Sequence, residues 1–203
     1  MRHDDAIVIV IFDVVEKDCG QYDTVTEVMW VTGAALFIRL ADYREVGGLD
    51  DHFFAHMEEI DLCWRLRSRG KKLVCIPQSV VYHVGGATLK KENPRKTFLN
   101  FRNNLLMLYK NLPDKELEHV LFIRGILDRV AALVFYLKKD RANARAVMQA
   151  RREFEDIRYS FAASRIENIM KSTDEMIPER THFSILMKYY LLGKKHFSQL
   201  KLF

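Results

Sequence analysis

The sequence changes character at Asn93-Pro94, and this change limits the architectures that the chain can adopt. Before it, short apolar and β-branched runs alternate with polar segments that contain glycine, which is typical of alternating strands and helices. After it, apolar residues recur three and four positions apart, which indicates amphipathic helices. The fold class that we predict is therefore α/β, followed by an all-helical tail.

The α/β piece is expected to hold several short buried strands. In the apolar run 28–40, Gly33, Ala34 and Ala35 would let another backbone or a ligand come close. Two short helices are expected, 41–49 closed by Gly47-Gly48 and 57–69 stopped by Gly70. The predicted strands are 6–12, 28–40 and two runs within 71–84 that are broken at Pro77.

The tail should begin with a well-defined helix, because Asn93 can cap it and Pro94 suits its first turn. We place a domain boundary after residue 112, between an α/β domain (1–112) and a helical extension (113–203). The predicted helices are 95–111, 114–139, 140–158, 161–171 and 182–197.

The net charge of +5 lies wholly in the second part of the sequence. Residues 1–112 carry 15 basic and 15 acidic residues, whereas residues 113–203 carry 17 basic and 12 acidic. A basic tail can meet an anionic membrane surface or nucleic acid, or can simply be a solvated helical surface. No pattern of a known nucleic-acid-binding module is present, so we expect no nucleic-acid partner.

The cysteines favour a reducing compartment, and we expect a cytoplasmic protein. Their odd number and irregular spacing argue against a disulfide framework and against a zinc site. The apolar run 6–12 is too short to span a bilayer, and 117–137 contains too many charges to do so. The cysteines are Cys19, Cys63 and Cys75.

The segment 117–137 predicts a helix with one broad apolar face and the pair Arg124 and Asp128 on the opposite side. This face can pack against the rest of the protein or against a second copy, forming a homodimer, or it can lie on the inner surface of a membrane. The predicted face comprises Leu117, Val120, Leu121, Leu127, Val130, Ala131 and Val134.

Acidic residues gather in the stretch AHMEEIDLCWRLRSRG (55–70). Glu58, Glu59 and Asp61 would lie in the first turn of a helix and three arginines near its end, which suits the helix dipole. Much of this pattern needs no chemistry to explain it, and Asp61 with Arg65 is a favourable i,i+4 ion pair. Glu58 or Glu59 could still act as a general base, and spacing alone does not choose between them.

Several ordered segments resemble the C-terminal half of bacterial family 2 glycosyltransferases, the GT-A, rhamnosyltransferase-like enzymes of cell-surface polysaccharide synthesis. The resemblance spans about residues 18–112, and the tail is similar only to the variable end of such enzymes. The segments are WVTGAALFIR (30–39), VGGLDDHFFAHMEEIDLCWRLRSRGKKLVCIP (46–77), VVYHVGG (80–86) and FRNNLLMLYKN (101–111).

The resemblance implies a catalytic role for the acidic pair Glu58-Glu59. In such enzymes the second acid, usually Asp, deprotonates the acceptor hydroxyl, and Glu59 takes that position here with one extra methylene. Asp61 and Arg65 match a recurrent element that we interpret as a structural ion pair.

The resemblance also implies an acceptor side. Gly33 and Ala34 match the segment that borders the acceptor pocket, and Asp50 belongs to the loop that leads toward the donor sugar. Trp30 could stack on a sugar ring, or it could equally be a buried core residue.

A donor diphosphate would be bound by Arg102, Asn103 and His83. In similar enzymes a histidine at this point can bind the divalent metal, Mg²⁺ or Mn²⁺, although a lone histidine at a strand end is more often only hydrogen-bonded. Arg102 and Asn103 are expected at the head of a helix, where guanidinium and backbone groups suit a diphosphate.

The resemblance further implies that the donor-binding half and its Asp-x-Asp metal site are missing from this sequence. We therefore expect an inverting transferase fragment that is inactive alone, whose complete enzyme uses a nucleotide sugar and a saccharide or lipid-linked acceptor. The alternative is a non-catalytic binding or assembly module on the same scaffold.

Overall fold

Helices dominate the computed structural model, which describes residues 19–82 and 93–173 together with positions 177, 178, 180, 188, 189, 192–194, 196 and 199. The α-helices and strands form in the order β1 (Thr26–Glu27), α1 (Leu40–Glu45), α2 (Glu58–Ser68), β2 (Val74–Cys75), α3 (Pro94–Asn111), α4 (Asp114–Leu137), α5 (Arg141–Ile157) and α6 (Ala162–Met170). Three 3₁₀ turns lie among them: η1 (Gly33–Ala35), η2 (Asp51–Phe53) and η3 (Arg158–Phe161).

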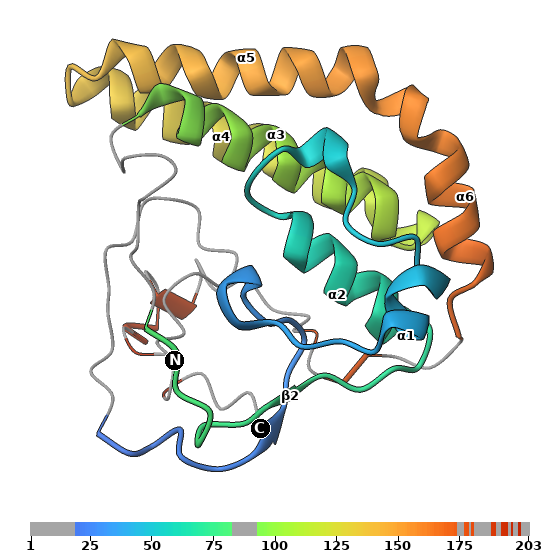
Figure 1. The fold of residues 1–203 in the computed structure, drawn as a ribbon. Coiled ribbons are helices and arrows are strands. Elements are labelled where there is room, and N and C mark those ends of the chain that lie inside the picture. The colour runs from blue at the N-terminus through green and yellow to red at the C-terminus, as the bar shows by residue number, and fades with distance from the viewer. Residues whose placement is uncertain are drawn as a thin grey trace.

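The long helices α3, α4 and α5 run side by side, and α2 lies against α3 (Figure 1). One apolar cluster joins α3, α4 and α5 through Phe101, Ala131 and Val147. A larger cluster joins α2, α3, α4 and α5 through Trp64, Leu105, Leu121 and Phe154. Residues on both sides of position 112 therefore share one core.

The described residues form one small sheet, in which β1 and β2 are antiparallel. Thr26 pairs with Cys75 and Glu27 with Val74. The described part of the chain is thus mostly helical with a two-stranded sheet, and the larger sheet of a GT-A fold is not seen within it.

The predicted strand over 28–40 is wrong. The Thr32 side chain accepts a hydrogen bond from the Ala34 N–H, which starts η1, and α1 already begins at Leu40. The small residues that follow Thr32 offer little side-chain packing to hold an extended strand, so the turn forms instead.

The predicted strand runs within 71–84 are only partly present. Residues 74–75 form β2, but 79–82 form no strand, because the chain turns at Pro77 with a Ser79 N–H···O=C Ile76 hydrogen bond of 3.0 Å. The predicted strand 6–12 and residues 83–84 lie outside the described residues, and so does most of the predicted helix 182–197.

The other predicted helices are confirmed, with ends within two residues of those expected, apart from the end of the first. Predicted to run to Leu49, it ends at Glu45, and Gly47 and Gly48 follow with φ of 83° and 70°. A Cβ on Gly48 would lie 2.9 Å from the Tyr43 ring, so this close turn requires glycine. Asn93 caps α3 by accepting from the Arg95 N–H, and Pro94 occupies its first turn.

The predicted orientation of α4 is wrong for its charged pair. Asp128 is fully buried and contacts Arg124 at 3.0 Å and Arg151 at 2.8 Å, so the pair faces α5 rather than solvent. A buried acid between two arginines satisfies its charge, which hydrophobic periodicity alone did not reveal. None of the described helices combines the length and the apolarity that crossing a bilayer requires.

Candidate functional site

A loop with unusual backbone angles leads into α2. Phe54, His56 and Met57 have φ of 62°, 70° and 73°, a region that residues other than glycine rarely adopt. The buried Asn103 side chain on α3 donates to the carbonyl oxygens of Phe53, Ala55 and His56, each at 2.8 Å. This amide holds the loop in place and thereby sets the position at which α2 begins.

The loop places Glu58 and Glu59 in the first turn of α2. Both residues are half-buried, and the Glu58 Oε2 atom is buried without a hydrogen-bond partner among the described residues. The positive end of the helix dipole favours carboxylates here. An acid in this position can accept a proton from a hydroxyl that approaches it directly or through one water.

Gly33 approaches Glu59. A Cβ built on Gly33 would lie 3.8 Å from the Glu59 Cβ, and both Gly33 and Ala34 are exposed. The structure therefore brings Gly33, one of the two small residues predicted to border an acceptor pocket, close to the acid predicted to be the base. Trp30, in contrast, is half-buried and packs against the larger apolar cluster.

Asp61 has no exposed surface and lies within a buried polar network. Its carboxylate accepts from Arg65 Nε at 3.0 Å, from Lys110 Nζ at 2.9 Å and from Asn111 Nδ2 at 2.7 Å. Arg65 also donates to the carbonyl oxygens of Val46 and Gly48. The ion pair of Asp61 and Arg65 thus joins α2 to α3 and to the loop after α1.

Asp50 belongs to this network rather than to the space beside Gly33. Its carboxylate accepts from Lys110 Nζ at 2.7 Å and from the His52 N–H at 3.1 Å. Partial burial opposes ionisation, but the hydrogen bond and charge of Lys110 outweigh it and hold the pKa of Asp50 below its ordinary value. Asp50 lines a cleft of 380 Å³ between the 46–52 loop and α6, whose lining does not include Glu58 or Glu59.

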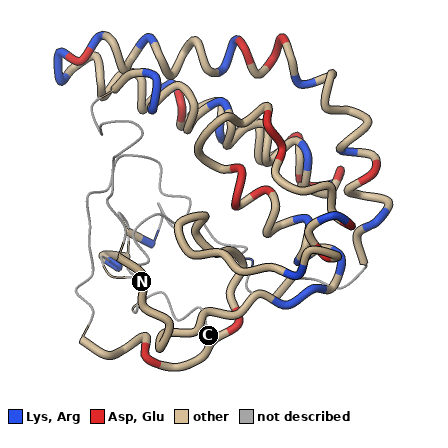
Figure 2. The backbone as a smooth tube through the Cα atoms, viewed as in Figure 1, with Lys and Arg blue, Asp and Glu red and all other residues tan. Residues whose placement is uncertain are grey.

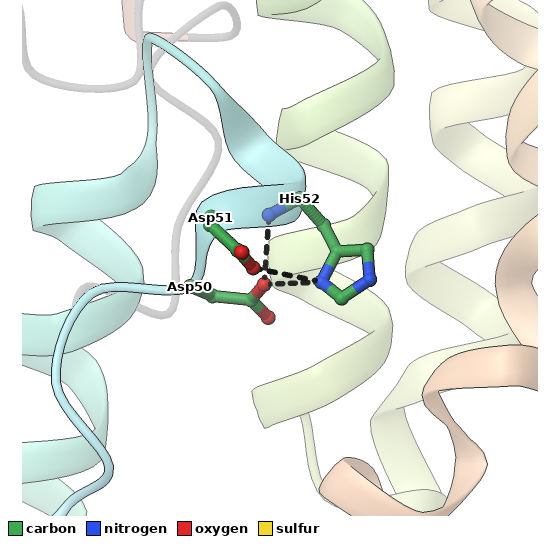
Figure 3. A group of neighbouring side chains, drawn as sticks. All are labelled: Asp50, Asp51 and His52. Atoms are coloured by element: carbon green, nitrogen blue, oxygen red, sulfur yellow. Dashed lines mark hydrogen bonds and ion pairs between the residues drawn. The ribbon is translucent and has the colours of Figure 1, made fainter.

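Asp50, Asp51 and His52 could together offer ligands to a metal (Figure 3). His52 Nδ1 lies 2.8 Å from Asp50 Oδ1 and 3.4 Å from Asp51 Oδ1. The Lys110 ammonium already neutralises Asp50 from the other side, and it would repel a divalent cation. This group does not fit Mg²⁺ or Mn²⁺ well, and the divalent metal remains a prediction.

Two of the residues predicted to bind a donor diphosphate, Arg102 and Asn103, lie in the middle of α3 rather than at its head. Arg102 contacts Glu153 at 2.7 Å and the His52 carbonyl oxygen at 3.0 Å. Asn103 has no exposed surface, and its amide is used by the 53–56 loop. His83 lies outside the described residues, and the diphosphate role of all three residues remains untested.

Cys63, one turn after Glu59, is unsuited to nucleophilic chemistry. Burial, together with the nearby charge of Glu59, raises the pKa of its thiol to about 11. The thiol therefore stays protonated near neutral pH.

Sequence reasoning missed Lys110, Asn111 and His52. Lys110 and Asn111 end the segment FRNNLLMLYKN, and both are buried. The only sign of this in the sequence is that Lys110 is a charged residue on the apolar side of a predicted helix. Their contacts with Asp61 join positions about fifty residues apart, which periodicity cannot reveal.

Comparison with known proteins finds glycosyltransferases. The chain is 31% identical over 141 residues to a pre-mycofactocin glycosyltransferase of Mycobacterium tuberculosis, covering 64% of this chain and 29% of that protein. It is 38% identical over 54 residues to the N-acetylglucosaminyl-diphospho-decaprenol L-rhamnosyltransferase of the same organism, covering 27% of this chain and 18% of that protein. It is 33% identical over 69 residues to the rhamnosyltransferase WbbL of Escherichia coli, covering 34% and 25%.

The matches thus span less than a third of each of these relatives. No family model matches the chain, and no solved structure matches it. The resemblance to rhamnosyltransferase-like glycosyltransferases is confirmed by these relatives.

Proposed function

We propose that this chain, whose relatives are glycosyltransferases, forms the acceptor side of an inverting glycosyltransferase with Glu59 as its general base. The observation that carries the proposal is the close approach of exposed Gly33 to Glu59 at the start of α2. A small residue there leaves room for an acceptor hydroxyl to reach the carboxylate.

In the proposed reaction, the acceptor hydroxyl oxygen attacks the anomeric carbon of a nucleotide sugar while Glu59 takes the hydroxyl proton. The bond from the anomeric carbon to the phosphate oxygen breaks, and the nucleoside diphosphate leaves with its electron pair. Attack opposite to the leaving group inverts the anomeric centre. Asn103 and the 53–57 loop act as positioning groups, because they fix where α2 presents Glu59.

The proposed donor is a nucleoside-diphosphate sugar, and rhamnose is the first sugar to test, because two relatives are rhamnosyltransferases. The proposed acceptor is a saccharide or a lipid-linked saccharide of the cell surface. We expect the donor site to lie outside these 203 residues, so that they transfer no sugar by themselves.

The base assignment is tested by Glu59→Gln in the full natural polypeptide, with Glu58→Gln as the matched control. We expect Glu59→Gln to lower kcat about 10²- to 10⁴-fold, as is typical of losing a general base. Glu58→Gln should have a far smaller effect. The measurement is acceptor-dependent release of nucleoside diphosphate, with thermal unfolding to show that both variants fold.

Two results would contradict the proposal in different ways. Full activity in Glu59→Gln would exclude this residue as the base but leave the transferase function intact. No transfer by the unaltered polypeptide with any nucleotide sugar tested would favour a non-catalytic binding or assembly module instead.

The acceptor side is tested at Gly33. An Ala Cβ would make only an ordinary contact of 3.8 Å with Glu59, whereas Leu would fill the space beside the carboxylate. We expect Gly33→Leu to raise KM for the acceptor at least about tenfold, equivalent to about 1.4 kcal/mol, and Gly33→Ala to change it little. Equal kinetics for both variants would remove Gly33 from the site.

A further inference from the structure

Helix α4 exposes a continuous apolar stripe. Phe122 and Leu137, at its two ends, keep 69% and 70% of their surface exposed, and each of the other members of the stripe keeps 40% or more. Over this length the stripe is about 22 Å long at 1.5 Å per residue. Its members are Phe122, Ile123, Ile126, Val130, Leu133, Tyr136 and Leu137.

The stripe lies opposite the side of α4 that packs inside the protein. Leu121, Gly125, Asp128, Ala131 and Ala132 are buried, and they recur at the same helical spacing on the other face. The packing of α4 against α3 and α5 therefore does not account for the apolar residues on its outward side. Contiguous exposed apolar surface of this kind marks an interaction site.

Positive charges lie at both ends of the stripe. Lys138 and Lys139 follow Leu137 directly, and Arg141 lies over the Tyr136 ring at 5.8 Å. These cations gather at the turn between α4 and α5 (Figure 2). At the other end, the exposed Lys115 is on the same helical face as Phe122. Between the two ends, the exposed Arg129 lies along one edge of the stripe.

Two acids near the stripe are paired with other residues. Asp114 pairs with Arg165 and Glu116 with Arg180. Asp140 caps α5 by accepting from the Asn143 N–H and Nδ2. Asp140 keeps its negative charge in this cap and Glu118 is exposed, but the exposed Lys115, Arg129, Lys138, Lys139 and Arg141 outnumber these two acids. The surface around the stripe therefore carries a net positive charge.

This charge pattern distinguishes the two occupants that an apolar helix face commonly has. In a symmetric dimer built on α4, each cationic end of one helix would lie near a cationic end of the other helix, whether the two helices were parallel or antiparallel. Like charges in these positions repel. An anionic lipid surface, in contrast, attracts both ends while the apolar side chains enter the acyl boundary.

We propose that α4 is an interfacial membrane helix that seats the protein on an anionic lipid surface through Phe122–Leu137, with Lys115, Lys138, Lys139 and Arg141 contacting the headgroups. The proposal does not depend on glycosyl transfer, because it rests on α4 alone. It would place the protein where lipid-borne substrates lie, and its failure would leave the assignment of Glu59 unaffected.

The test is co-sedimentation of the 203-residue chain with vesicles of phosphatidylcholine alone or with phosphatidylglycerol added. We expect binding to the anionic vesicles, weakened at least tenfold in the double variant Ile126→Glu, Leu133→Glu. The matched control changes two exposed apolar residues away from α4, Phe37→Glu and Val80→Glu, and should bind like the unaltered chain.

A second variant isolates the charges. Lys138→Gln with Lys139→Gln removes two cations, each worth about fivefold near an anionic surface, so binding should fall roughly 25-fold and lose much of its salt dependence. Circular dichroism checks that every variant keeps its helix content.

Three outcomes would overturn the proposal. The first is no binding of the unaltered chain to anionic vesicles, and the second is equal binding to neutral and anionic vesicles. The third is a dimer by size-exclusion chromatography that the Ile126→Glu, Leu133→Glu variant dissociates while vesicle binding is absent, which would assign the stripe to a second copy.

Discussion

Within one turn of α2, the pair Glu58-Glu59 and the residue Asp61 have opposite environments. Asp61 is fully buried and contacts two cations and an amide. Glu58 and Glu59 are half-buried beside exposed Gly33, and the Glu58 Oε2 atom has no hydrogen-bond partner among the described residues. Carboxylates of the same helix therefore divide into one that lies within the buried polar network and two that lie at the half-buried start of the helix.

The largest effect is expected from Asp61→Asn. This change removes the counter-charge of the buried Arg65 and leaves Lys110 paired with Asp50 alone, and breaking a buried pair in this way costs about 3–5 kcal/mol of unfolding free energy. Urea unfolding measures the loss. Glu58→Gln, one turn earlier, should change stability by no more than about 0.5 kcal/mol. Equal losses in both variants would abolish the distinction between the two sets of acids.

Asn103→Ala tests how the 53–57 loop holds Glu58 and Glu59 in place. Its removal leaves the carbonyl oxygens of Phe53, Ala55 and His56 without this donor, at an expected cost of about 1–3 kcal/mol. Amide hydrogen exchange in the loop should rise selectively. Asn100→Ala, on the same helix, serves as the control, and unchanged exchange in Asn103→Ala would show that the loop holds its conformation by itself.

The smallest effect is expected from Asp50, at the edge of the buried network. Its pKa in the folded protein is below the ordinary 3.8, so its ionised form stabilises the fold above that pH. The stabilisation should disappear as the pH falls through the lowered value. Asp50→Asn should therefore be less stable than the unaltered chain at about pH 7, and the difference should shrink toward about pH 3.

Denaturant unfolding of both proteins across this range provides the measurement. A difference between them that is independent of pH would mean that Asp50 contributes by packing or capping rather than by charge.

Most of the helices could be predicted from the sequence. Asn93-Pro94 predicts the start of α3, Pro113-Asp114 predicts the start of α4, and Gly70 predicts the end of α2. These signals are local, because helix-capping and helix-breaking residues act through neighbouring backbone groups. The prediction of a strand over 28–40 was wrong, because the run of apolar residues was interpreted as extended although Thr32 begins a local turn within it. Apolar runs of this length do not by themselves distinguish strands from other buried segments.

The candidate site was only partly predictable. Glu58, Glu59 and Gly33 were identified from their resemblance to glycosyltransferase segments, but the proximity of Gly33 to Glu59 follows only from the tertiary structure. Asn103 was identified as a ligand for a diphosphate, whereas the structure uses its amide to hold a loop about fifty residues away in the sequence. Hydrogen bonds between distant segments depend on how α2 and α3 pack, which no local pattern contains.

The sequence by itself determined where the helices begin and end and which residues are apolar, because these depend on neighbours along the chain. Only the tertiary structure decided which face of each helix is buried. In α4 it turned Arg124 and Asp128 inward and left Phe122, Ile126 and Leu133 outside. The physical reason is that a helix with apolar residues on several sides can pack in more than one orientation. Here the buried position of Asp128 between Arg124 and Arg151 fixes that orientation.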